Sequence, residues 1–335
     1  MKPKIFITQP MEESALNKLI PHLEVDVHPD VIQTITKEAL LAGVPGKDYL
    51  LARLGDQIDA DVINANPKLK LIATMAGGPA GIDVEAATKL GIPVIGRYVD
   101  PSVPGSGVTN ETADLTWALL MAVARRIVEG DKLTRAGVFP GPHSMYILGS
   151  QVHGKKLGIV GMGKIGKAIA KRACGFDMKI YYYSRKQHPD VEQDFNAAYL
   201  SFEELLQTVD FVCMCPWYTP ETYHMIGEKQ LNMMKPSAFL INTSRGPVVD
   251  LKALIAALVE KKIAGAGLDV YEGEPHPVFP RVLLDMPNVV MTPHMGSAVA
   301  EKRERMSHEI VDEVLAFVRG QRPSLIFNPE VLGKS

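Results

Sequence analysis

Short apolar runs alternate with helical stretches along nearly the whole chain, and this alternation limits the fold more than any other feature. Apolar strands that alternate with helices form parallel sheets covered by helices on both faces. The runs that we expect to be strands are Ile5–Thr8, Glu24–Val27, Tyr49–Ala52, Leu69–Thr74, Pro93–Ile95, Lys156–Val160, Lys179–Tyr183, Phe211–Cys215, Ala238–Asn242, Gly265–Asp269 and Val289–Thr292.

The strands fall into two sets, and a chain of 335 residues has room for about two domains. A Pro-, Gly- and Ser-rich stretch, Val99–Gly107, separates the sets, and a long helix is predicted over Thr109–Glu129. The last predicted helix, Ser297–Arg319, is assigned to the first set. We therefore expect one α/β domain from residues 1–104 and 299–335, and a second doubly wound domain from residues 105–298.

A glycine-rich turn joins the strand Lys156–Val160 to a predicted helix over Lys164–Cys174. In G-x-G-x-x-G the first glycine allows a tight turn, the second lets the backbone approach a pyrophosphate, and the third packs helix on strand. The helix N-terminus then presents free N–H groups to the anion. The pattern predicts a dinucleotide site rather than a turn alone, with contacts from Gly161, Met162, Gly163, Lys164, Ile165 and Gly166.

The next strand indicates which dinucleotide is preferred. An NAD site usually has Asp or Glu about 20 residues after the glycines, where it binds the ribose 2′-hydroxyl. Here the strand ends in Ser184-Arg185-Lys186, a hydroxyl and two cations. Arg can hold a phosphate with two N–H groups at once. We expect NADP(H) to be preferred, with NAD(H) possible; a solvated basic loop is the alternative.

Three residues of acid–base and carboxylate-binding type follow strands of the second set. Arg245 follows Ala238–Asn242, Glu274 follows Gly265–Asp269, and His294 follows Val289–Thr292. The carboxyl ends of parallel strands face the ligand crevice. A planar guanidinium suits a carboxylate with a neighbouring carbonyl. A carboxylate beside an imidazole stabilises the imidazolium, which can protonate a carbonyl oxygen while hydride reaches its carbon.

The composition excludes several other classes of protein. Lys and Arg number 36 against 38 Asp and Glu, which argues against a nucleic-acid binder. No apolar run approaches the roughly 18 residues of a membrane span. Three cysteines argue against a disulfide scaffold and favour the cytoplasm. Cys213 and Cys215 lie inside a predicted strand with no matching pair, so core packing is favoured over zinc binding.

These motifs together resemble the D-isomer-specific 2-hydroxyacid dehydrogenases, most closely the glyoxylate/hydroxypyruvate reductases. The resemblance rests on the segments Gly161–Gly166, Asn242–Gly246, Leu268–Pro275 and Pro293–Ser297, and it extends from about residue 4 to about residue 325. It implies a Rossmann cofactor domain inserted into a flavodoxin-like substrate domain. It also implies reduction of a small 2-keto acid to the D-2-hydroxy acid.

The resemblance assigns roles to residues of this chain. It implies that Arg245 binds the substrate carboxylate, that His294 is the proton donor, and that Glu274 keeps His294 protonated. Further implied substrate contacts are Leu54, Gly77 and Gly78, and further implied cofactor contacts are Thr109, Thr243, Ser244 and Asp269.

The family is usually a homodimer, and the regions Thr109–Glu129 and Gly137–Gly149 resemble its dimerisation region. Several segments depart from the family pattern. The loop Met75–Gly81 lacks the usual aromatic and polar residues, the stretch Arg97–Val108 is longer, and Cys215–Pro220 carries Trp217 and Tyr218. The arm around Tyr146 lacks a tryptophan that related reductases have. All four segments touch the expected cleft, so a larger 2-keto acid such as 2-ketogluconate is an alternative substrate.

Three other functions share this fold. Formate dehydrogenases have Gln at the position of Glu274, which argues against that activity. Erythronate-type and phosphoglycerate dehydrogenases usually carry an acid at the position of Ser184. A non-catalytic corepressor-like sensor of dinucleotides is an alternative of a different class, and its lack of turnover would distinguish it.

Overall fold

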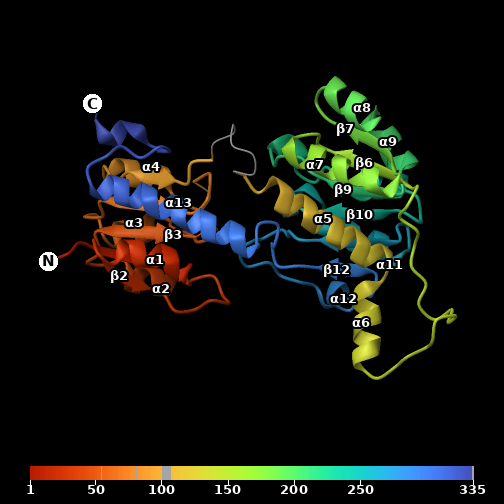
Figure 1. The fold of residues 1–335 in the computed structure, drawn as a ribbon, viewed down its shortest axis with the longest axis horizontal. Coiled ribbons are helices and arrows are strands. Elements are labelled where there is room, and N and C mark those ends of the chain that lie inside the picture. The colour runs from red at the N-terminus through yellow and green to blue at the C-terminus, as the bar shows by residue number, and fades with distance from the viewer. Residues whose placement is uncertain (54, 80, 100–106, 334–335) are drawn as a thin grey trace. The chain divides into compact units, whose positions relative to one another are not determined.

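The computed structural model describes residues 1–53, 55–79, 81–99 and 107–333. Contacts divide the chain into two compact units: unit 1 holds residues 1–107 and 298–335, and unit 2 holds residues 108–297. Figure 1 shows that each unit has helices packed around its own sheet. The predicted boundary at 104/105 and most of the stretch Val99–Gly107 lie outside the described residues.

Unit 1 is a five-stranded parallel sheet in the order β2-β1-β3-β4-β5. This order is that of the flavodoxin-like doubly wound sheets. Its elements are β1 (Lys4–Ile7), α1 (Glu13–Leu19), β2 (Glu24–Val27), α2 (Lys37–Gly43), β3 (Tyr49–Ala52), α3 (Ala60–Asn64), β4 (Leu71–Thr74), α4 (Val84–Lys89), β5 (Val94–Gly96), α13 (Ala300–Val318) and the 3₁₀ turn η4 (Pro329–Leu332).

The last helix, α13, completes the core of unit 1. Its buried face, which includes Met306, Ile310 and Val314, packs against α1 and the sheet. Apolar residues at these spacings line one face of a helix, so burying that face holds α13 on the sheet. The prediction that the C-terminal helix belongs with the N-terminal strands agrees with this packing.

Unit 2 is a seven-stranded parallel sheet in the order β12-β11-β10-β9-β6-β7-β8. Its helices are α5 (Thr109–Ala124), α6 (Ile127–Arg135), α7 (Lys164–Ala173), α8 (Pro189–Phe195), α9 (Phe202–Thr208), α10 (Glu228–Met233), α11 (Leu251–Val259) and α12 (Arg281–Leu284), with 3₁₀ turns η1 (Cys174–Phe176), η2 (Pro220–Thr222) and η3 (Gly246–Val248). Its strands are β6 (Lys156–Val160), β7 (Lys179–Tyr183), β8 (Ala198–Tyr199), β9 (Phe211–Met214), β10 (Phe239–Asn242), β11 (Gly265–Leu268) and β12 (Val289–Met291).

The chain of unit 2 winds outward from β6 in both directions, first through β7 to β8 and then through β9 to β12. The point where the direction reverses lies between β6 and β9, and ligands of such sheets bind outside the strand ends at this point. The two doubly wound parallel sheets confirm the predicted fold class. Strands β6, β9, β10 and β11 are almost fully buried, which explains their continuous apolar sequences, whereas β12 is half-buried.

The prediction of one helix over Thr109–Glu129 is wrong. The structure has two helices there, α5 and α6, because Arg126 adopts a left-handed backbone conformation with φ +53°. A left-handed residue cannot continue a right-handed helix, so α5 ends and a new helix begins. No residue of α6 is buried, and an extended arm of residues 137–150 follows it (Figure 1).

Cys213 is fully buried in the core of unit 2 and Cys215 packs against the same core. This agrees with the expected packing role of both residues. In the described part of the chain, no helix is long and apolar enough to span a membrane.

Candidate functional site

The glycine turn after β6 has the geometry that the sequence pattern predicts. Gly161 has φ +95°, and a Cβ there would lie 2.8 Å from the backbone of Cys215 and Pro216 at the end of β9. At Gly166 a Cβ would lie 2.3 Å from the Gly161 carbonyl oxygen. These two glycines are therefore required by close packing of the protein itself.

Gly163 differs from its two neighbours in the motif. A Cβ at Gly163 would meet no atom within 4 Å, although the residue sits at the N-terminus of α7. Gly163 and Lys164 are exposed, whereas Met162 is buried beneath them. The open space above Gly163, at a helix N-terminus that points its N–H groups outward, fits the pyrophosphate of a dinucleotide.

Basic side chains lie at the end of the next strand, β7. The Ser184 hydroxyl donates a hydrogen bond to the Lys186 carbonyl oxygen, which closes a tight turn. Arg185 and Lys186 are both exposed on this turn. A hydrogen bond from Thr219 is the main cause that lowers the pKa of Glu221 on η2, and the charge of Arg185 contributes in the same sense. The turn therefore presents two cations at the place where a ribose 2′-substituent is expected.

His294 and Glu274 form a hydrogen-bonded pair at the carboxyl ends of β12 and β11. The distance from His294 Nδ1 to Glu274 Oε2 is 2.6 Å. The second carboxylate oxygen, Oε1, accepts the backbone N–H of Tyr271 at 2.7 Å. Each side chain is about one-third exposed, so the pair stays open to a ligand. With Nδ1 engaged by Glu274, Nε2 is the ring nitrogen left for proton exchange.

Asp269 shapes the loop that carries His294. The carbonyl oxygen of Asp269 accepts the His294 N–H at 2.9 Å. The carboxylate accepts the N–H groups of Met295 at 2.6 Å and Gly296 at 2.9 Å, and the Thr292 hydroxyl at 2.6 Å. The side chain is 1% exposed, and burial raises the pKa of its carboxyl. These bonds hold His294 in a left-handed conformation, φ +55°.

Arg245 lies on a turn that is fixed by Asn242, the last residue of β10. The Asn242 amide donates to the Arg245 carbonyl oxygen at 3.1 Å and accepts from the Ser244 hydroxyl at 2.8 Å. The next residue, Gly246, packs directly on the backbone of Tyr271 and Glu272, where a Cβ would clash at 1.9 Å. The turn of Arg245 and the loop of Glu274 are therefore in contact.

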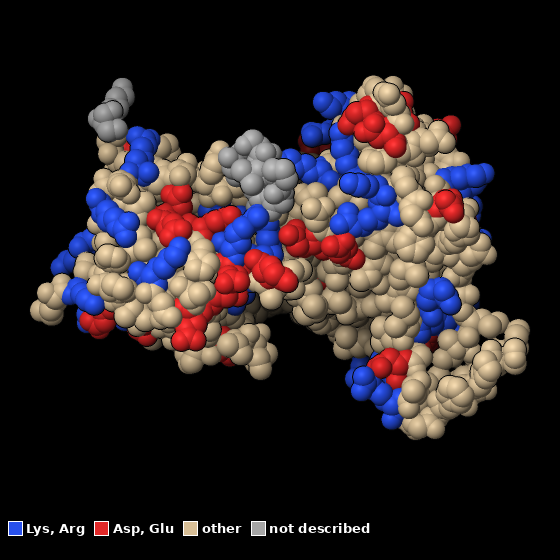
Figure 2. Space-filling model, in the orientation of Figure 1, with Lys and Arg blue, Asp and Glu red and all other residues tan. Residues whose placement is uncertain are grey.

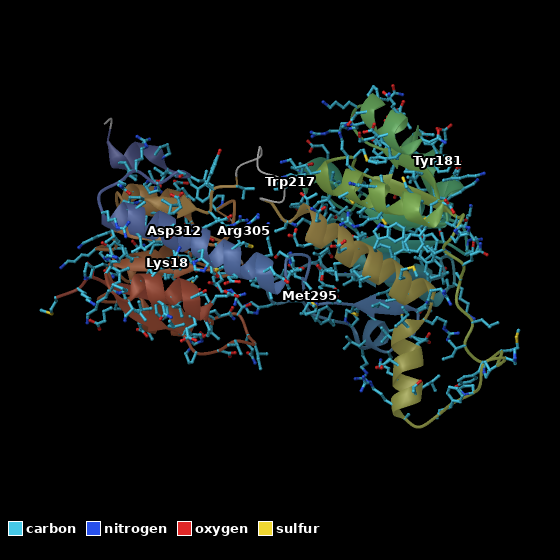
Figure 3. All side chains as sticks on the ribbon, in the orientation of Figure 1. Lys18, Tyr181, Trp217, Met295, Arg305 and Asp312 are labelled. Carbon is cyan, nitrogen blue, oxygen red and sulfur yellow. The ribbon has the colours of Figure 1, made fainter. Side chains whose placement is uncertain are left out.

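The guanidinium of Arg245 is exposed and lies 5.8 Å from the ring centroid of Trp217. This is the geometry of a cation–π interaction. Trp217 itself is 79% exposed, on the segment that follows β9, and Figure 3 labels it together with Met295. Trp217, one of the two aromatic residues that depart from the family pattern, is thus placed beside the expected carboxylate-binding residue.

The remaining predicted residues are placed as follows. Thr109 is the first residue of α5, and Ser244 is buried. The hydroxyl of buried Thr243 lies 2.7 Å from that of Thr116 on α5. Gly77 and Gly78 lie on the loop after β4 in unit 1, and Leu54 lies outside the described residues. Thus Arg245, Glu274, His294 and Asp269 are brought together in unit 2.

Sequence reasoning did not foresee the bonds of Asn242, Tyr271 and Asp269 that orient these side chains. The Tyr271 hydroxyl lies 2.9 Å from the Thr292 carbonyl oxygen, which joins the loops of Glu274 and His294. These residues are partners across turns and neighbouring strands. The one feature of the sequence that could have indicated these hydrogen bonds is the position of Asn242, Asp269 and Tyr271 at or just after strand ends.

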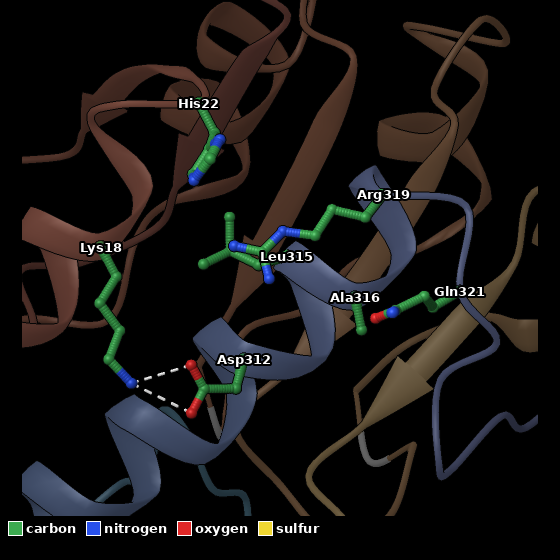
Figure 4. A pocket seen from close by; sticks show the side chains of 7 residues that line it. All are labelled: Lys18, His22, Asp312, Leu315, Ala316, Arg319 and Gln321. Atoms are coloured by element: carbon green, nitrogen blue, oxygen red, sulfur yellow. Dashed lines mark hydrogen bonds and ion pairs between the residues drawn. The ribbon is translucent and has the colours of Figure 1, made fainter.

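A cavity of about 430 Å³ lies in unit 1 between α1 and the end of α13. Figure 4 shows Lys18 and Asp312 paired across it, at 2.8 Å, with His22 and Arg319 farther along the wall. None of its lining residues belongs to a motif singled out by the sequence. We assign it no role.

Comparison with known proteins decides the family. The family model described as "D-isomer specific 2-hydroxyacid dehydrogenase, NAD binding domain" matches residues 117–296. A glyoxylate reductase of Thermococcus litoralis is 46% identical over 100% of this chain and 99% of its own length. The chain belongs to the D-isomer-specific 2-hydroxyacid dehydrogenases. It is accordingly an NAD(P)-dependent oxidoreductase with a nicotinamide dinucleotide as its cofactor.

Solved structures with the same fold agree with this assignment. A protein of Thermus thermophilus is 40% identical and matches with a TM-score of 0.84, covering 97% of this chain and 99% of the other. An NADPH-dependent glyoxylate/hydroxypyruvate reductase from Sinorhizobium meliloti is 27% identical, with a TM-score of 0.75, covering 98% and 99%. The expected relation to this family is therefore confirmed.

Proposed function

We propose that this dehydrogenase reduces glyoxylate or hydroxypyruvate to the D-2-hydroxy acid with NADPH as hydride donor. The observation that carries the proposal is the His294–Glu274 pair, held beside the turn of Arg245 at the carboxyl edge of one sheet. The name glyoxylate reductase of the Thermococcus relative supports the substrate class.

In this proposal His294 supplies the proton. A nicotinamide dinucleotide, when bound at the glycine turn, would supply the hydride that forms the new C–H bond at the keto carbon. The imidazolium of His294 gives its Nε2 proton to the keto oxygen, which becomes the hydroxyl group. Glu274 accepts the hydrogen bond from Nδ1 at 2.6 Å and stabilises the positive charge of the ring before the proton leaves.

Arg245 binds and orients the substrate in this proposal. Its exposed guanidinium can take the carboxylate with two parallel N–H bonds and also polarise the keto oxygen. One donor, Nη1, is bound to the Ser244 carbonyl oxygen at 2.7 Å, which limits rotation of the side chain. Trp217 covers one side of the same guanidinium and narrows the positions that a substrate can take.

The preference for NADPH rests on the Ser184–Lys186 turn. Two exposed cations and a hydroxyl replace the carboxylate that would repel a 2′-phosphate. A guanidinium and an ammonium bind phosphate through charge-assisted hydrogen bonds. The similar reductase of Sinorhizobium meliloti is NADPH-dependent, and this supports the same choice.

The decisive experiment measures initial rates of the purified protein with glyoxylate, hydroxypyruvate, pyruvate and 2-ketogluconate. NADPH and NADH are run side by side for each substrate. We expect fastest oxidation of NADPH with glyoxylate or hydroxypyruvate. Faster oxidation of the cofactor with 2-ketogluconate than with glyoxylate or hydroxypyruvate would contradict the proposed substrate. Faster rates with NADH than with NADPH would contradict the proposed cofactor. Tight binding of NADPH without turnover of any keto acid would favour a dinucleotide sensor.

We also propose that the protein is a homodimer joined through α6 and the arm that follows it. Val138, Phe139, Met145, Tyr146 and Leu148 are all large apolar residues exposed on this arm. Figure 2 shows the arm as a surface without charged side chains. Exposed apolar patches of this kind mark protein–protein contacts. Sedimentation of the wild type and of Phe139→Ser with Met145→Ser tests the proposal: a dimeric variant would contradict it.

The cytoplasm is the compartment we propose. All three cysteines are free thiols, one of them exposed. Free thiols persist in a reducing compartment. Cell fractionation followed by immunoblotting tests this placement.

A further inference from the structure

The chain leaves β7 in unit 2 and is bound back to the same strand a few residues later. The Ser184–Lys186 turn follows β7 directly, and α8 begins at Pro189. The Tyr182 hydroxyl, on a side chain of β7, accepts the backbone N–H of His188 at 2.7 Å. This hydrogen bond closes the loop around residues 183–187. The far end of the loop that carries the two exposed cations is therefore fixed by Tyr182.

Tyr182 is a rigid anchor for this loop. Its side chain is 0% exposed and packs in the core of unit 2. The same hydroxyl donates a hydrogen bond to Glu192 Oε1, on α8, at 2.6 Å. Burial and, after it, the Glu192 carboxylate raise the pKa of Tyr182 to about 12, so the phenol keeps its proton at neutral pH. With one hydrogen bond donated and one accepted, the orientation of the hydroxyl is set from two sides.

Helix α8 receives the chain after the turn and is itself held on the sheet. The carbonyl oxygen of His188 accepts the N–H groups of Val191 at 3.0 Å and Glu192 at 3.1 Å, which opens the helix. Val191 is 1% exposed and packs in the same core as Tyr182. His188 thus joins the hydroxyl of Tyr182 to the first turn of a fixed helix.

A second tyrosine contacts the near end of the turn. The Tyr199 hydroxyl, on β8, donates to the Ser184 carbonyl oxygen at 3.4 Å. The Tyr199 ring packs edge-on against the ring of Tyr182, with the two centroids 5.4 Å apart. Hydrogen bonds between oxygen atoms are usually about 2.7–2.8 Å long, so Tyr199 holds the turn less firmly than Tyr182 does.

Two carboxylates lie on α8 just after the loop, and both are engaged. Asp190 forms an ion pair with Lys167 of α7, and the hydrogen bond from Lys167 lowers the pKa of Asp190. Glu192 accepts the Tyr182 hydroxyl. In the part of the chain that the structure describes, neither carboxylate forms an ion pair with a cation of the turn. Arg185 and Lys186 therefore stay available to a ligand.

We propose that Tyr182 is a positioning residue for cofactor selection, because its bond to His188 gives the Ser184–Lys186 turn the shape that binds a ribose 2′-phosphate. The inference rests on the proposed function, which takes NADPH as the cofactor. In it the two cations supply the charge and Tyr182 supplies their placement. Charge-assisted hydrogen bonds depend on distance and direction, so a turn released at His188 keeps its charge but loses bonding geometry.

The test measures the binding of NADP⁺ and NAD⁺ to the full chain by calorimetry. Wild type is compared with Tyr182→Phe, which removes only the hydroxyl, and with Tyr181→Phe as the matched control. Tyr181, labelled in Figure 3, belongs to the same strand but packs in the core on the opposite face of the sheet. We expect the preference for NADP⁺, the Kd of NAD⁺ divided by that of NADP⁺, to fall about twofold to tenfold in Tyr182→Phe. The control should keep the wild-type preference.

Two further measurements separate positioning from general stability. Adenosine 2′,5′-bisphosphate and AMP differ in the 2′-phosphate alone, and their affinity ratio should fall in Tyr182→Phe as the dinucleotide ratio does. Hydrogen exchange of the His188 amide should become faster in this variant, while exchange in α7 stays unchanged. An equal loss of affinity for NADP⁺ and NAD⁺, or no change for either, would overturn the proposal.

Glu192→Ala takes the place of Tyr182→Phe if that variant does not fold. Loss of a carboxylate charge near the turn would by itself strengthen the binding of a phosphate. Loss of the acceptor that orients the Tyr182 hydroxyl should weaken it. We expect the preference for NADP⁺ to fall in Glu192→Ala, and an unchanged or higher preference would contradict the proposal.

The wild type tests the proposed cofactor separately. Equal or tighter binding of NAD⁺ than of NADP⁺ to the wild type would contradict the proposed function, and the role of Tyr182 with it. Tighter binding of NADP⁺ to the wild type, with the same preference in Tyr182→Phe, would contradict the role of Tyr182 alone. No keto acid enters these measurements, so the identity of the substrate does not affect the result.

Discussion

The backbone carbonyl of Asp269 accepts the N–H of His294 at 2.9 Å, and the Asp269 carboxylate binds the next two N–H groups of the same loop. One buried residue at the end of β11 thus sets the path of the chain that presents the imidazole. His294 therefore depends on a neighbouring strand for its position.

Replacing Asp269 by Asn tests this dependence. The amide keeps the shape but has one acceptor oxygen, so at least one N–H of the loop is left without a partner. Leaving a buried donor unsatisfied costs about 1–3 kcal/mol. We expect a loss of that size in the free energy of unfolding, measured with urea, and a lower kcat. Wild-type stability in Asp269→Asn would show that the carboxylate does not hold the loop.

Replacing His294 by Asn removes the proposed proton donor with little strain, because Asn tolerates the left-handed backbone that His294 adopts. We expect kcat for keto-acid reduction to fall by about 10²–10⁴-fold. The Kd for NADPH, followed by fluorescence, should stay close to that of the wild type. Turnover at the wild-type rate would exclude His294 as the acid.

Gly161→Ala and Gly163→Ala form a matched pair that separates packing from cofactor binding. A methyl group at 161 meets backbone atoms at 2.8 Å, so this variant should unfold at lower temperature. A methyl group at 163 meets no protein atom within 4 Å. Gly163→Ala should therefore keep the melting temperature and lose affinity for the dinucleotide. Equal cofactor affinity in Gly163→Ala and wild type would place the pyrophosphate elsewhere.

Replacing Arg185 and Lys186 by Ser should weaken the binding of NADPH more than the binding of NADH. Hydrogen bonds to a charged group contribute about 1.5–3 kcal/mol, so kcat/KM for NADPH should fall about tenfold to a hundredfold. The value for NADH should change little, since NADH has no 2′-phosphate. An equal loss for both cofactors would contradict the assignment of the Ser184–Lys186 turn.

Asp210 gives a prediction about acid stability. Burial would raise its pKa, but the Lys156 N–H and the Lys235 ammonium, both at 2.9 Å, hold the pKa below the ordinary value. Its stabilising contribution is therefore present above the unfolded-state pKa of about 3.9 and is lost as pH falls through the folded-state value. Wild type should exceed Asp210→Asn in unfolding free energy at pH 6, and the difference should shrink toward pH 3. A constant difference would contradict this account.

The strands of both sheets could be predicted because each strand is specified by a short stretch of neighbouring residues in the sequence. A strand that is covered on both faces needs a continuous apolar run, as Lys156–Val160 has, and this strand is observed with the predicted bounds. The half-buried strand Lys179–Tyr183 also has the predicted bounds. The strand-end positions of Arg245, Glu274 and His294 follow from the same pattern. Their grouping within unit 2 could therefore be expected from sequence.

Other features have causes that sequence patterns do not carry. The short helix α3 depends on a cap by Asp59 and on the packing of Val62 and Ile63, so its periodicity alone is too brief to identify it. The break at Arg126 needs a left-handed residue where no glycine marks one. The bonds of Asp269 join residues from two strands, and only the folded chain brings these together.

The packing of α13 onto the first strands has a consequence for how the chain reaches this structure. A ribosome makes α13 after all of residues 108–297, so β1 and α1 are made long before the helix that buries their apolar face. Packing α13 on the N-terminal strands closes a loop that contains residues 108–297, and loop closure has an entropic cost. If residues 108–297 fold first as an independent body, this loop becomes effectively shorter and its closure costs less entropy. The apolar face of the N-terminal strands therefore stays partly uncovered during synthesis until α13 has been made.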